Sequence, residues 1–220
     1  MSFQALVASP LGDILLTADA AGLTGLYFTD QRDCPRLAGV AAAGDIISRP
    51  SAGTREGRQT RRFRAVPAAG GELFPAPGAS GDPDASGLVA APRFLQAGMP
   101  AGPRAVLEQT CRELDEYWRG RRRVFDMPLN PHGTGFQQRV WRALLDVPCG
   151  ATLSYGELAL QAGLSAGHGR AVGTAVGSNP ISIVIPCHRI LARDGTLNGY
   201  GGGLDRKIRL LEIEGFAIRA

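Results

Sequence analysis

The chain has 220 residues, and its 44% hydrophobic content is enough for one large domain or two small ones, each with a buried core. No basic segment followed by a long apolar run opens the chain, and nowhere do about eighteen apolar residues follow one another, so we expect a soluble, cytoplasmic protein without an export signal or membrane span. The net charge of +4 is compatible with a nucleic-acid partner but does not require one.

The N-terminal stretch, residues 3–28, alternates short apolar runs with Gly and Asp turns. This pattern predicts two or three antiparallel strands, the last of which ends at Phe28. Residues 33–91 then change to Ala, Gly, Pro, Ser and Arg with little periodicity. A compact domain does not easily hold so long a structureless segment, so we interpret most of it as a solvated insertion. Its arginine cluster could contact phosphates or belong to a disordered loop: Arg58, Arg61, Arg62 and Arg64.

Residues 103–123 return to a regular pattern, with four apolar side chains at helical spacing. They are Leu107, Cys111, Leu114 and Trp118. We expect a helix there, with Cys111 in the core. The following stretch is typical of a linker, and we place a domain boundary near Pro131. The prediction is an N-terminal domain over residues 1–130 and a C-terminal domain over residues 131–220.

The C-terminal part begins with helical patterns. Residues 134–150 predict a helix with four apolar side chains inward: Phe136, Val140, Trp141 and Leu144. Ser154 and Glu157 then form a capping box that starts a short helix, which Gly163 closes. Residues 169–180 predict another helix, whose exposed face carries mostly Ala and Gly. Two short helices joined by a tight turn are typical of a helix-turn-helix, although many small helical domains contain such pairs.

The stretch "SIVIPCHRIL", residues 182–191, places a thiol at the end of an apolar run. We expect a buried strand, a turn at Pro186, and Cys187 beside His188 and Arg189. A thiol is a strong nucleophile only as the thiolate, and a nearby positive charge or a histidine that accepts the proton favours that form. Neighbours on an extended strand face opposite sides, so the Cys-His pair could also be coincidental.

The other cysteines give no sign of disulfides or metal. Cys34, Cys111 and Cys149 are far apart in the sequence, no C-x-x-C pair occurs, and the three histidines show no zinc-ligand spacing. We therefore expect free thiols and no metal.

The second half of the chain contains three specific stretches: "GTGFQQRVWRALLDVPCGATLSYGELA", "RAVGTAVGSNP" and "NPISIVIPCHRILARDGTLNGYGGGLDRKIRLLEIEG". Their order and spacing resemble the methylated-DNA–protein-cysteine methyltransferases, the O6-alkylguanine-DNA alkyltransferase repair proteins. The likeness covers about residues 133–215, and the first strands and the helix before the linker match more loosely. It implies an α+β fold: an N-terminal α/β domain with a small antiparallel, ribonuclease H-like sheet, and a mainly helical, winged-helix-like C-terminal domain with a helix-turn-helix.

The resemblance implies DNA repair by direct reversal. Cys187 is the expected acceptor of the alkyl group on guanine O6, and it keeps that group as a thioether, so each molecule acts once as a methyltransferase. His188 is expected to take the thiol proton through a bound water, and Glu214 to orient the imidazole. From the residues alone, Glu214 could instead be an exposed carboxylate at a helix end. O4-methylthymine is a further candidate substrate.

The resemblance also implies nucleotide flipping, because a thiol cannot reach an alkyl group inside a stacked duplex. Arg170 matches the family's arginine that fills the vacated place in the stack, although it could also be a solvated arginine at a helix start. Tyr155 matches the tyrosine that rotates the 3′ phosphate. Ala171 and Gly173 suit a helix that approaches the narrow minor groove. The expected partner is double-stranded DNA containing O6-alkylguanine, bound by a monomer that needs no cofactor and no membrane.

Other positions match residues that hold the flipped base. Tyr200 matches a tyrosine that donates to guanine N3, which stabilises charge on the leaving base. Gly201 stands where the family uses a backbone N–H to bind O6. The base amino group would meet the carbonyls of Cys187 and Ile190, and Asn179 would tie the helix pair to the active-site turn.

Two features depart from the family. Gly167 and Gly169 stand where better helix formers are usual, and a glycine inside a helix costs about 1 kcal/mol relative to alanine, so we expect a looser start of the recognition helix. Cys149 stands where a tyrosine is common, and we interpret it as a packing residue.

Three alternative functions fit part of the sequence. A non-catalytic alkyl-lesion DNA-binding protein of the same fold would lack the acceptor Cys187. A transcriptional sensor would need an additional DNA-binding module, and a thiol hydrolase would need a histidine downstream of His188. The sequence therefore favours the methyltransferase.

Overall fold

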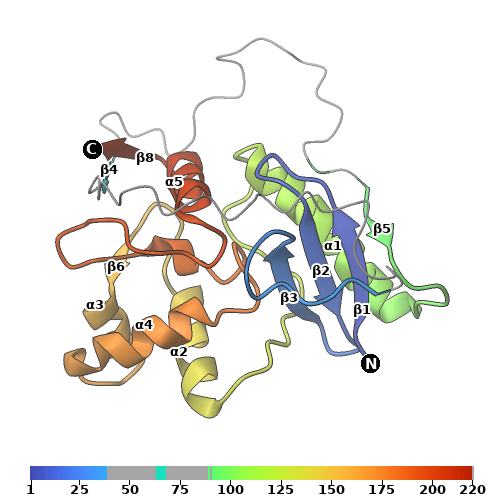
Figure 1. Cartoon of the computed structure of the whole chain (residues 1–220), viewed down its shortest axis with the longest axis horizontal. Helices are drawn as coiled ribbons and strands as arrows, with labels where there is room; N and C mark the ends of the chain where they lie inside the picture. The colour runs from blue at the N-terminus through green and yellow to red at the C-terminus, as the bar shows by residue number, and fades with distance from the viewer. Residues whose placement is uncertain (39–62, 68–88, 90, 220) are drawn as a thin grey trace, which may run out of the picture.

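The computed structural model describes residues 1–38, 63–67, 89 and 91–219 (Figure 1). The strands are β1 Phe3–Val7, β2 Ile14–Ala18, β3 Leu23–Phe28, β4 Arg64–Pro67, β5 Arg93–Phe94, β6 Leu153–Ser154, β7 Ile190–Leu191 and β8 Phe216–Arg219. The helices are α1 Ala101–Trp118, α2 Gly135–Leu145, α3 Tyr155–Gln161, α4 Gly169–Gly177 and α5 Leu204–Ile213, with 3-10 turns at Ala166–His168 and Cys187–Arg189. None of the described helices is long and apolar enough to cross a lipid bilayer.

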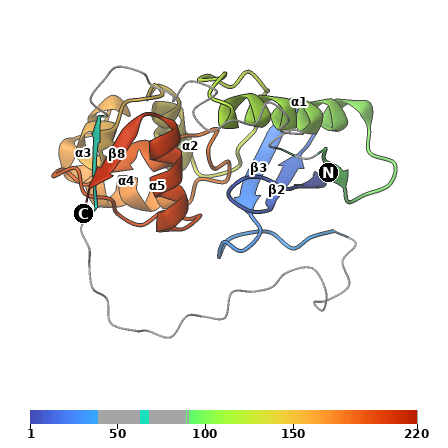
Figure 2. The same cartoon turned by 90° about the horizontal axis from the view of Figure 1, so that it is seen from above.

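The N-terminal half is an antiparallel sheet of strand order β3-β2-β1-β5, and α1 lies across one of its faces (Figures 1 and 2). β2 is buried along its whole length, which explains why its residues are apolar almost without alternation. The predicted stripe of α1 is confirmed, because Leu107 and Leu114 are fully buried and Cys111 and Trp118 nearly so. The predicted strands within residues 3–28 are confirmed as three.

The C-terminal half contains α2 to α5 (Figure 1). The predicted inward face of α2 is confirmed for Val140, Trp141 and Leu144, while Phe136 packs against the same core but is only half-buried. The Trp141 indole N–H donates to the Ala175 carbonyl of α4 at 2.9 Å. The predicted capping box of α3 is also confirmed: Glu157 N–H donates to the Ser154 hydroxyl, and Ser154 N–H donates to the Glu157 carboxylate. Gly163 follows α3 with a φ of +70°, a conformation that favours glycine. The helix-turn-helix is therefore α3 followed by α4, and the α+β fold class is confirmed.

The two glycines expected to loosen α4 lie at its boundary. Gly167 belongs to the 3-10 turn before the helix, and Gly169 is the first residue of α4. The cost of a glycine applies to helix interiors, where the backbone must be held by hydrogen bonds on both sides. The structure therefore gives no reason for a loosened recognition helix.

β3 joins the two halves. Leu23 N–H donates to the Pro128 carbonyl at 2.7 Å, so the linker docks on this edge strand. Leu26 N–H donates to the Pro180 carbonyl at 2.8 Å, and Ser182 N–H donates to the Leu26 carbonyl at 3.1 Å. One continuous cluster of buried side chains extends through both halves. The chain segment that leads to Cys187 is thus built onto the N-terminal sheet, while the domain boundary near Pro131 stays a prediction.

The predicted insertion contains ordered structure. β4 pairs antiparallel with β8 near the C-terminus, from Arg64 opposite Arg219 to Pro67 opposite Phe216. Val89 is buried in the main core. The expectation of a structureless segment is therefore wrong for residues 63–67 and 89, because long-range pairing and not local periodicity orders them. Within the arginine cluster only Arg64 is described; Arg58, Arg61 and Arg62 lie outside the described residues.

Candidate active site

The segment before Cys187 is a tight turn and not the strand that the sequence predicts. Ile183 has a φ of +70°, a left-handed conformation that β-branched residues rarely adopt. Val184 N–H donates to the Ser182 carbonyl at 2.8 Å, which closes the turn. Residues 181–185 are nevertheless all buried, so their apolar character reflects burial without a strand. The prediction of a strand here is wrong.

Asn179, just after α4, holds this turn against the sulfur. Its side-chain amide donates to the Ile185 carbonyl at 2.8 Å and to Cys187 Sγ at 3.0 Å. Its side-chain oxygen accepts the Ile181 N–H at 3.0 Å. Because Asn179 is buried with all three partners, it couples the end of α4 rigidly to the thiol.

Glu214, directly after α5, is the centre of a buried polar cluster. Its Oε1 accepts hydrogen bonds from Tyr117 Oη at 2.9 Å and from Arg189 Nη2 at 2.8 Å, and lies 2.9 Å from His188 Nε2. Its Oε2 accepts from Arg189 Nε at 2.8 Å. Glu214 and His188 have no exposed surface. The alternative of an exposed carboxylate at a helix end is therefore wrong.

Burial sets the protonation states of this cluster. It lowers the pKa of His188, and the Glu214 carboxylate only partly offsets this, so the imidazole is neutral at pH 7. Burial opposes ionisation of Glu214, but His188 and Arg189 outweigh it and hold the pKa of that carboxyl well below its usual range. His188 Nε2–H therefore donates to Glu214, and its Nδ1 is left as a buried acceptor with no hydrogen-bond partner among the described residues.

Burial also raises the pKa of the Cys187 thiol, while the Asn179 hydrogen bond and the positive charge of Lys207 act in the opposite direction. The resting sulfur is therefore protonated at neutral pH. A protonated thiol needs a base before it can act as a nucleophile. His188 Nδ1, on the next residue, is a neutral base with an unused lone pair.

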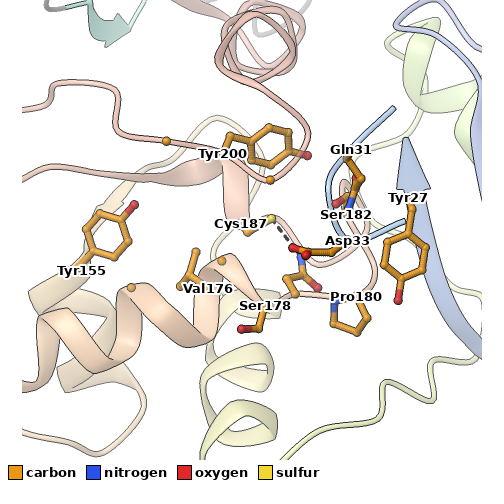
Figure 3. A pocket seen from close by; sticks show the side chains of 15 residues that line it. Tyr27, Gln31, Asp33, Tyr155, Val176, Ser178, Pro180, Ser182, Cys187 and Tyr200 are labelled. Carbon is orange, nitrogen blue, oxygen red and sulfur yellow. Dashed lines mark hydrogen bonds between the residues drawn. The ribbon is translucent and has the colours of Figure 1, made fainter. Parts of the chain in front are cut away.

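Cys187 lines a cavity of about 330 Å³ between the two halves (Figure 3). Tyr27, Gln31 and Asp33 form the wall on the side of the N-terminal sheet. The rest of the lining comes from the start of α3, from α4, from the turn and from the loop before α5: Tyr155, Gly173, Val176, Gly177, Ser178, Asn179, Pro180, Ser182, Gly199, Tyr200 and Gly201. A cavity of this size, with a thiol at its wall and polar groups around it, can hold a small planar molecule.

Tyr200 forms one side of the cavity opposite the α4 side (Figure 3). Its hydroxyl is buried and makes no hydrogen bond of good geometry within the described residues. Burial raises the pKa of Tyr200 well above its ordinary value, so the hydroxyl remains a donor. Glycine at position 202 lets the Tyr200 ring pack in this place, because a Cβ there would lie 2.8 Å from both the Tyr200 and Phe28 rings. Gly201 lines the cavity with open space beside its Cα.

The helix pair is next to this cavity. Tyr155 at the start of α3 lies close to Gly173, where a Cβ would be 3.5 Å from the Tyr155 ring. Arg170 and Ala171 are exposed on α4 and do not line the cavity. Ile190 is buried behind it, and its carbonyl accepts a hydrogen bond from Lys207 Nζ at 2.6 Å. The structure thus brings Tyr155, Gly173, Asn179, Cys187, Tyr200 and Gly201 around one cavity. His188 and Glu214 lie in the buried cluster next to it, and Arg170 and Ala171 lie on the outer helix face.

Sequence reasoning missed several residues of this site. The sequence marks Arg189 only as a positive neighbour of the thiol, whereas its guanidinium binds Glu214. Tyr117 falls three residues after Leu114 on the buried face of α1, a helical spacing that could have shown its burial but not its partner. Lys207 is the chain's only lysine, and its burial lowers its pKa to about 8. No local pattern marked Asp33 as a cavity residue.

The described residues contain no cluster of three or more His, Cys, Asp or Glu side chains suited to a metal, and the expectation of no metal stays a prediction.

Sequence comparison places the site in a known family. Residues 135–216 match the family model described as "6-O-methylguanine DNA methyltransferase, DNA binding domain". The methylated-DNA–protein-cysteine methyltransferase of Mycobacterium tuberculosis H37Rv is 54% identical over 102 residues, which cover 46% of this chain and 61% of that protein. The enzyme of the same name from Mycolicibacterium paratuberculosis is 50% identical over 119 residues, 54% of this chain and 71% of the relative.

Structural comparison agrees with the sequence matches. The crystal structure of Mycobacterium tuberculosis OGT in complex with DNA matches with a TM-score of 0.63 at 30% identity, covering 96% of this chain and 92% of the other. The R37L variant of the M. tuberculosis O6-methylguanine methyltransferase matches with a TM-score of 0.59 at 32% identity, covering 98% and 93%. The turn with its Pro-Cys-His-Arg motif, the buried glutamate and the helix pair all lie in or beside the best-matched segment. The chain therefore belongs to the methylated-DNA–protein-cysteine methyltransferase family.

Proposed function

We propose that the protein repairs DNA by transferring the alkyl group from O6 of guanine to Cys187. The observation that carries this proposal is the position of the Cys187 sulfur at a cavity of about 330 Å³, beside the buried pair of His188 and Glu214. The M. tuberculosis structure that contains DNA supports a nucleic-acid partner. A chromosomal substrate and four free cysteines suit the cytoplasm.

The chemistry follows from the protonation states. His188 Nδ1 takes the Cys187 thiol proton, directly or through one water, and Glu214 stabilises the imidazolium that results. The thiolate forms a bond to the alkyl carbon as the bond from that carbon to O6 breaks. The electron pair of the broken bond stays on guanine. Because Arg189 already holds Glu214 as a carboxylate, the cluster needs no rearrangement when the imidazole becomes charged.

The cavity residues hold the base in this proposal. Tyr200 keeps a buried donor with no other strong partner, which suits a hydrogen bond to guanine N3, and the N–H of Gly201 suits O6. Asn179 fixes the turn so that the carbonyl of Cys187 can accept from the base amino group. The Ile190 carbonyl already accepts from Lys207, so its second lone pair is the one that remains for the base.

The exposed face of α4 would enter the minor groove. Ala171, Thr174 and Gly177 present only small side chains there, which permits close approach to the backbone of DNA. Arg170 would fill the gap left by the flipped nucleotide, and Tyr155 would turn the adjacent phosphate. We also propose that residues 131–220 form the unit that binds DNA and accepts the alkyl group, supported on the sheet of residues 1–130.

The proposal is tested by the stoichiometry of transfer. Incubating the protein with excess duplex containing O6-methylguanine should add one methyl group per chain, on the tryptic peptide that contains Cys187, because a thioether offers water no leaving group at neutral pH. Peptide mass spectrometry measures both the site and the extent of methylation. Repeated turnover, or methyl on Cys34, Cys111 or Cys149, would contradict the proposal. DNA binding without any transfer would instead favour the non-catalytic lesion-binding alternative.

The role of Arg170 is tested by comparing two substrates. Arg170→Ala should slow repair of duplex DNA by about tenfold or more, because the vacated place in the stack is left unfilled, but should hardly change reaction with the free alkylated base, which needs no flipping. Single-turnover kinetics on both substrates measure the difference. Arg139→Ala removes an exposed arginine of α2 and controls for lost charge. If Arg170→Ala slowed the reaction equally on duplex DNA and on the free base, Arg170 would have no role in nucleotide flipping.

A further inference from the structure

β4 connects to more than the C-terminal strand. Along one edge it pairs with β8. Along the other edge, Leu197 N–H donates to the Phe63 carbonyl at 2.8 Å, and Ala65 N–H donates to the Gly195 carbonyl at 3.4 Å. Arg64 forms an antiparallel bridge with Thr196 between these two bonds. β4 is therefore the middle of three antiparallel segments, and the third is the start of the loop that carries Tyr200.

The start of that loop is held mainly by bonds within its own turn and by β4. Residues 192–196 form a turn closed by Ala192 N–H to the Thr196 carbonyl and by Thr196 to the Asp194 side chain, which are bonds inside the turn. In the described part of the chain, the backbone hydrogen bonds that residues 195–197 make outside this turn all go to Phe63 and Ala65. The anchor on one side of the loop is thus β4.

The sequence that follows makes an anchor necessary. Residues 198–203 read Asn-Gly-Tyr-Gly-Gly-Gly, and glycine loses more conformational freedom on ordering than any other residue. After Leu197, the loop is next held by Lys207 Nζ, which donates to the Asn198 carbonyl at 3.4 Å. Tyr200 follows two residues later and must reach the cavity wall with glycines on both sides. Beyond Tyr200 the loop is held by Gly203 N–H, which donates to the Tyr200 carbonyl at 2.9 Å, and by Arg206 Nη1, which donates to the Gly202 carbonyl at 2.8 Å. Tyr200 is therefore positioned by anchors on both sides, and β4 supplies those on the N-terminal side.

Side chains reinforce the backbone contact. Ala65 of β4, Leu197 of the loop and Ile218 of β8 pack on a small apolar cluster, separate from the main core, formed by Leu191, Leu211 and Phe216. Leu191 is the last residue before the turn, and Leu211 lies on α5. The cluster therefore joins the residue before the loop and Leu197 within it to α5, and Ala65 brings β4 into the same cluster.

We propose that residues 63–67 position the Tyr200 loop, so that a segment of the predicted insertion helps to hold the flipped base. The proposal rests on the proposed function, because it assigns β4 to the same cavity. β4 does not touch the base. It acts through Leu197 and Gly195 on the loop that supplies Tyr200 and Gly201, and it is a positioning element.

The test removes one N–H from β4. Ala65→Pro deletes the donor to Gly195 but leaves the residues on either side, Arg64 and Val66, in their pairing with β8. Ala65→Ser keeps the N–H and nearly the same volume, and is the matched control. Single-turnover transfer is measured with the free alkylated base, so that DNA contacts do not enter, alongside thermal melting and binding of undamaged duplex.

Transfer by Ala65→Pro should fall by between about tenfold and about a hundredfold, since misplacing a binding group by about 1 Å has effects of this size. Melting and binding of undamaged DNA should stay close to those of Ala65→Ser. In a Tyr200→Phe background, Ala65→Pro should slow transfer much less, because the Tyr200 hydroxyl that β4 positions is already absent. A merely structural role for β4 would not produce this dependence on Tyr200.

Two outcomes would overturn the proposal. One is a wild-type transfer rate for folded Ala65→Pro, and the other is a double variant with Tyr200→Phe whose rate loss equals the product of the two single losses. If Ala65→Pro does not fold, Leu197→Ala decides the question in its place, because it loosens the loop from the shared cluster without changing any strand backbone. Failure of the wild-type protein to transfer an alkyl group at all would refute the proposed function, which is a different result from normal transfer by the β4 variants.

Discussion

Cys187→Ala is expected to abolish alkyl transfer while leaving DNA binding intact. The sulfur is the atom that accepts the alkyl group in the proposed reaction, so its removal should lower transfer by at least about ten-thousandfold, to below detection. The other thiols cannot replace it. Burial raises the pKa of Cys34 to about 11, of Cys111 to about 12 and of Cys149 to about 11, and none of the three lines the cavity.

Binding separates this result from misfolding. Affinity for undamaged duplex should stay within about threefold of the wild type, because phosphate contacts supply non-specific binding and the buried sulfur makes none. The melting temperature should fall by only about 2–6 °C, as expected for loss of one small buried group. Cys149→Ala serves as the matched control, since it removes a half-buried thiol that also follows a proline, and should transfer at the wild-type rate. Methyl transfer by Cys187→Ala would assign the acceptor to another atom.

Glu214→Gln is expected to cause the largest loss of stability. The carboxylate accepts from Tyr117, His188 and Arg189 at once, whereas an amide has a single acceptor oxygen and would turn an NH₂ group toward donors. The change leaves the Arg189 guanidinium buried without its counter-ion. Removing one partner of a buried ion pair costs about 3–5 kcal/mol, which corresponds to a melting temperature lower by about 6–20 °C.

Transfer by the folded fraction should also slow, by about a hundredfold or more, because the imidazole loses the group that fixes its Nε2–H and stabilises its charged form. Glu212→Gln is the control two residues earlier. Its carboxylate is 39% exposed and pairs with Arg209 at the surface, so its loss should change the melting temperature by no more than about 2 °C. A double variant, Glu214→Gln with Arg189→Met, should recover part of the lost stability since it removes the unpaired charge.

The pH dependence of stability checks the same cluster. The folded protein holds the pKa of Glu214 well below the ordinary value of 4.5, so the unfolded chain binds the proton more tightly. The stability from this carboxylate is therefore fully present above pH 4.5 and is lost as the pH falls from there toward the folded pKa. Urea unfolding across this range should show the gap between wild type and Glu214→Gln narrowing below pH 4.5. A gap that stays constant into acid would mean that the carboxylate is not charged in the folded state.

Local sequence patterns are enough to predict the features that depend on neighbours along the chain. The capping box at Ser154, the apolar stripe of α1 and the inward face of α2 follow from periodicities of a few residues, which act before any tertiary contact forms. The Pro-Cys-His-Arg motif and the spacing of the helix pair, Tyr200 and Glu214 carried enough information to indicate the family.

The features that depend on distant partners could be known only once the chain was folded. Tyr117 and Glu214 are 97 residues apart, and no local pattern reveals that the Tyr117 hydroxyl donates a hydrogen bond to the Glu214 carboxylate. β4 is ordered because β8 and the Tyr200 loop offer it two edges, although its own composition predicts no structure. The apolar run at residues 181–185 can form a turn because the Asn179 side chain hydrogen-bonds the Ile181 N–H and the Ile185 carbonyl. These backbone groups therefore need no partner on a neighbouring strand. Buried polar groups must find partners wherever the fold brings them, and that requirement is set in three dimensions.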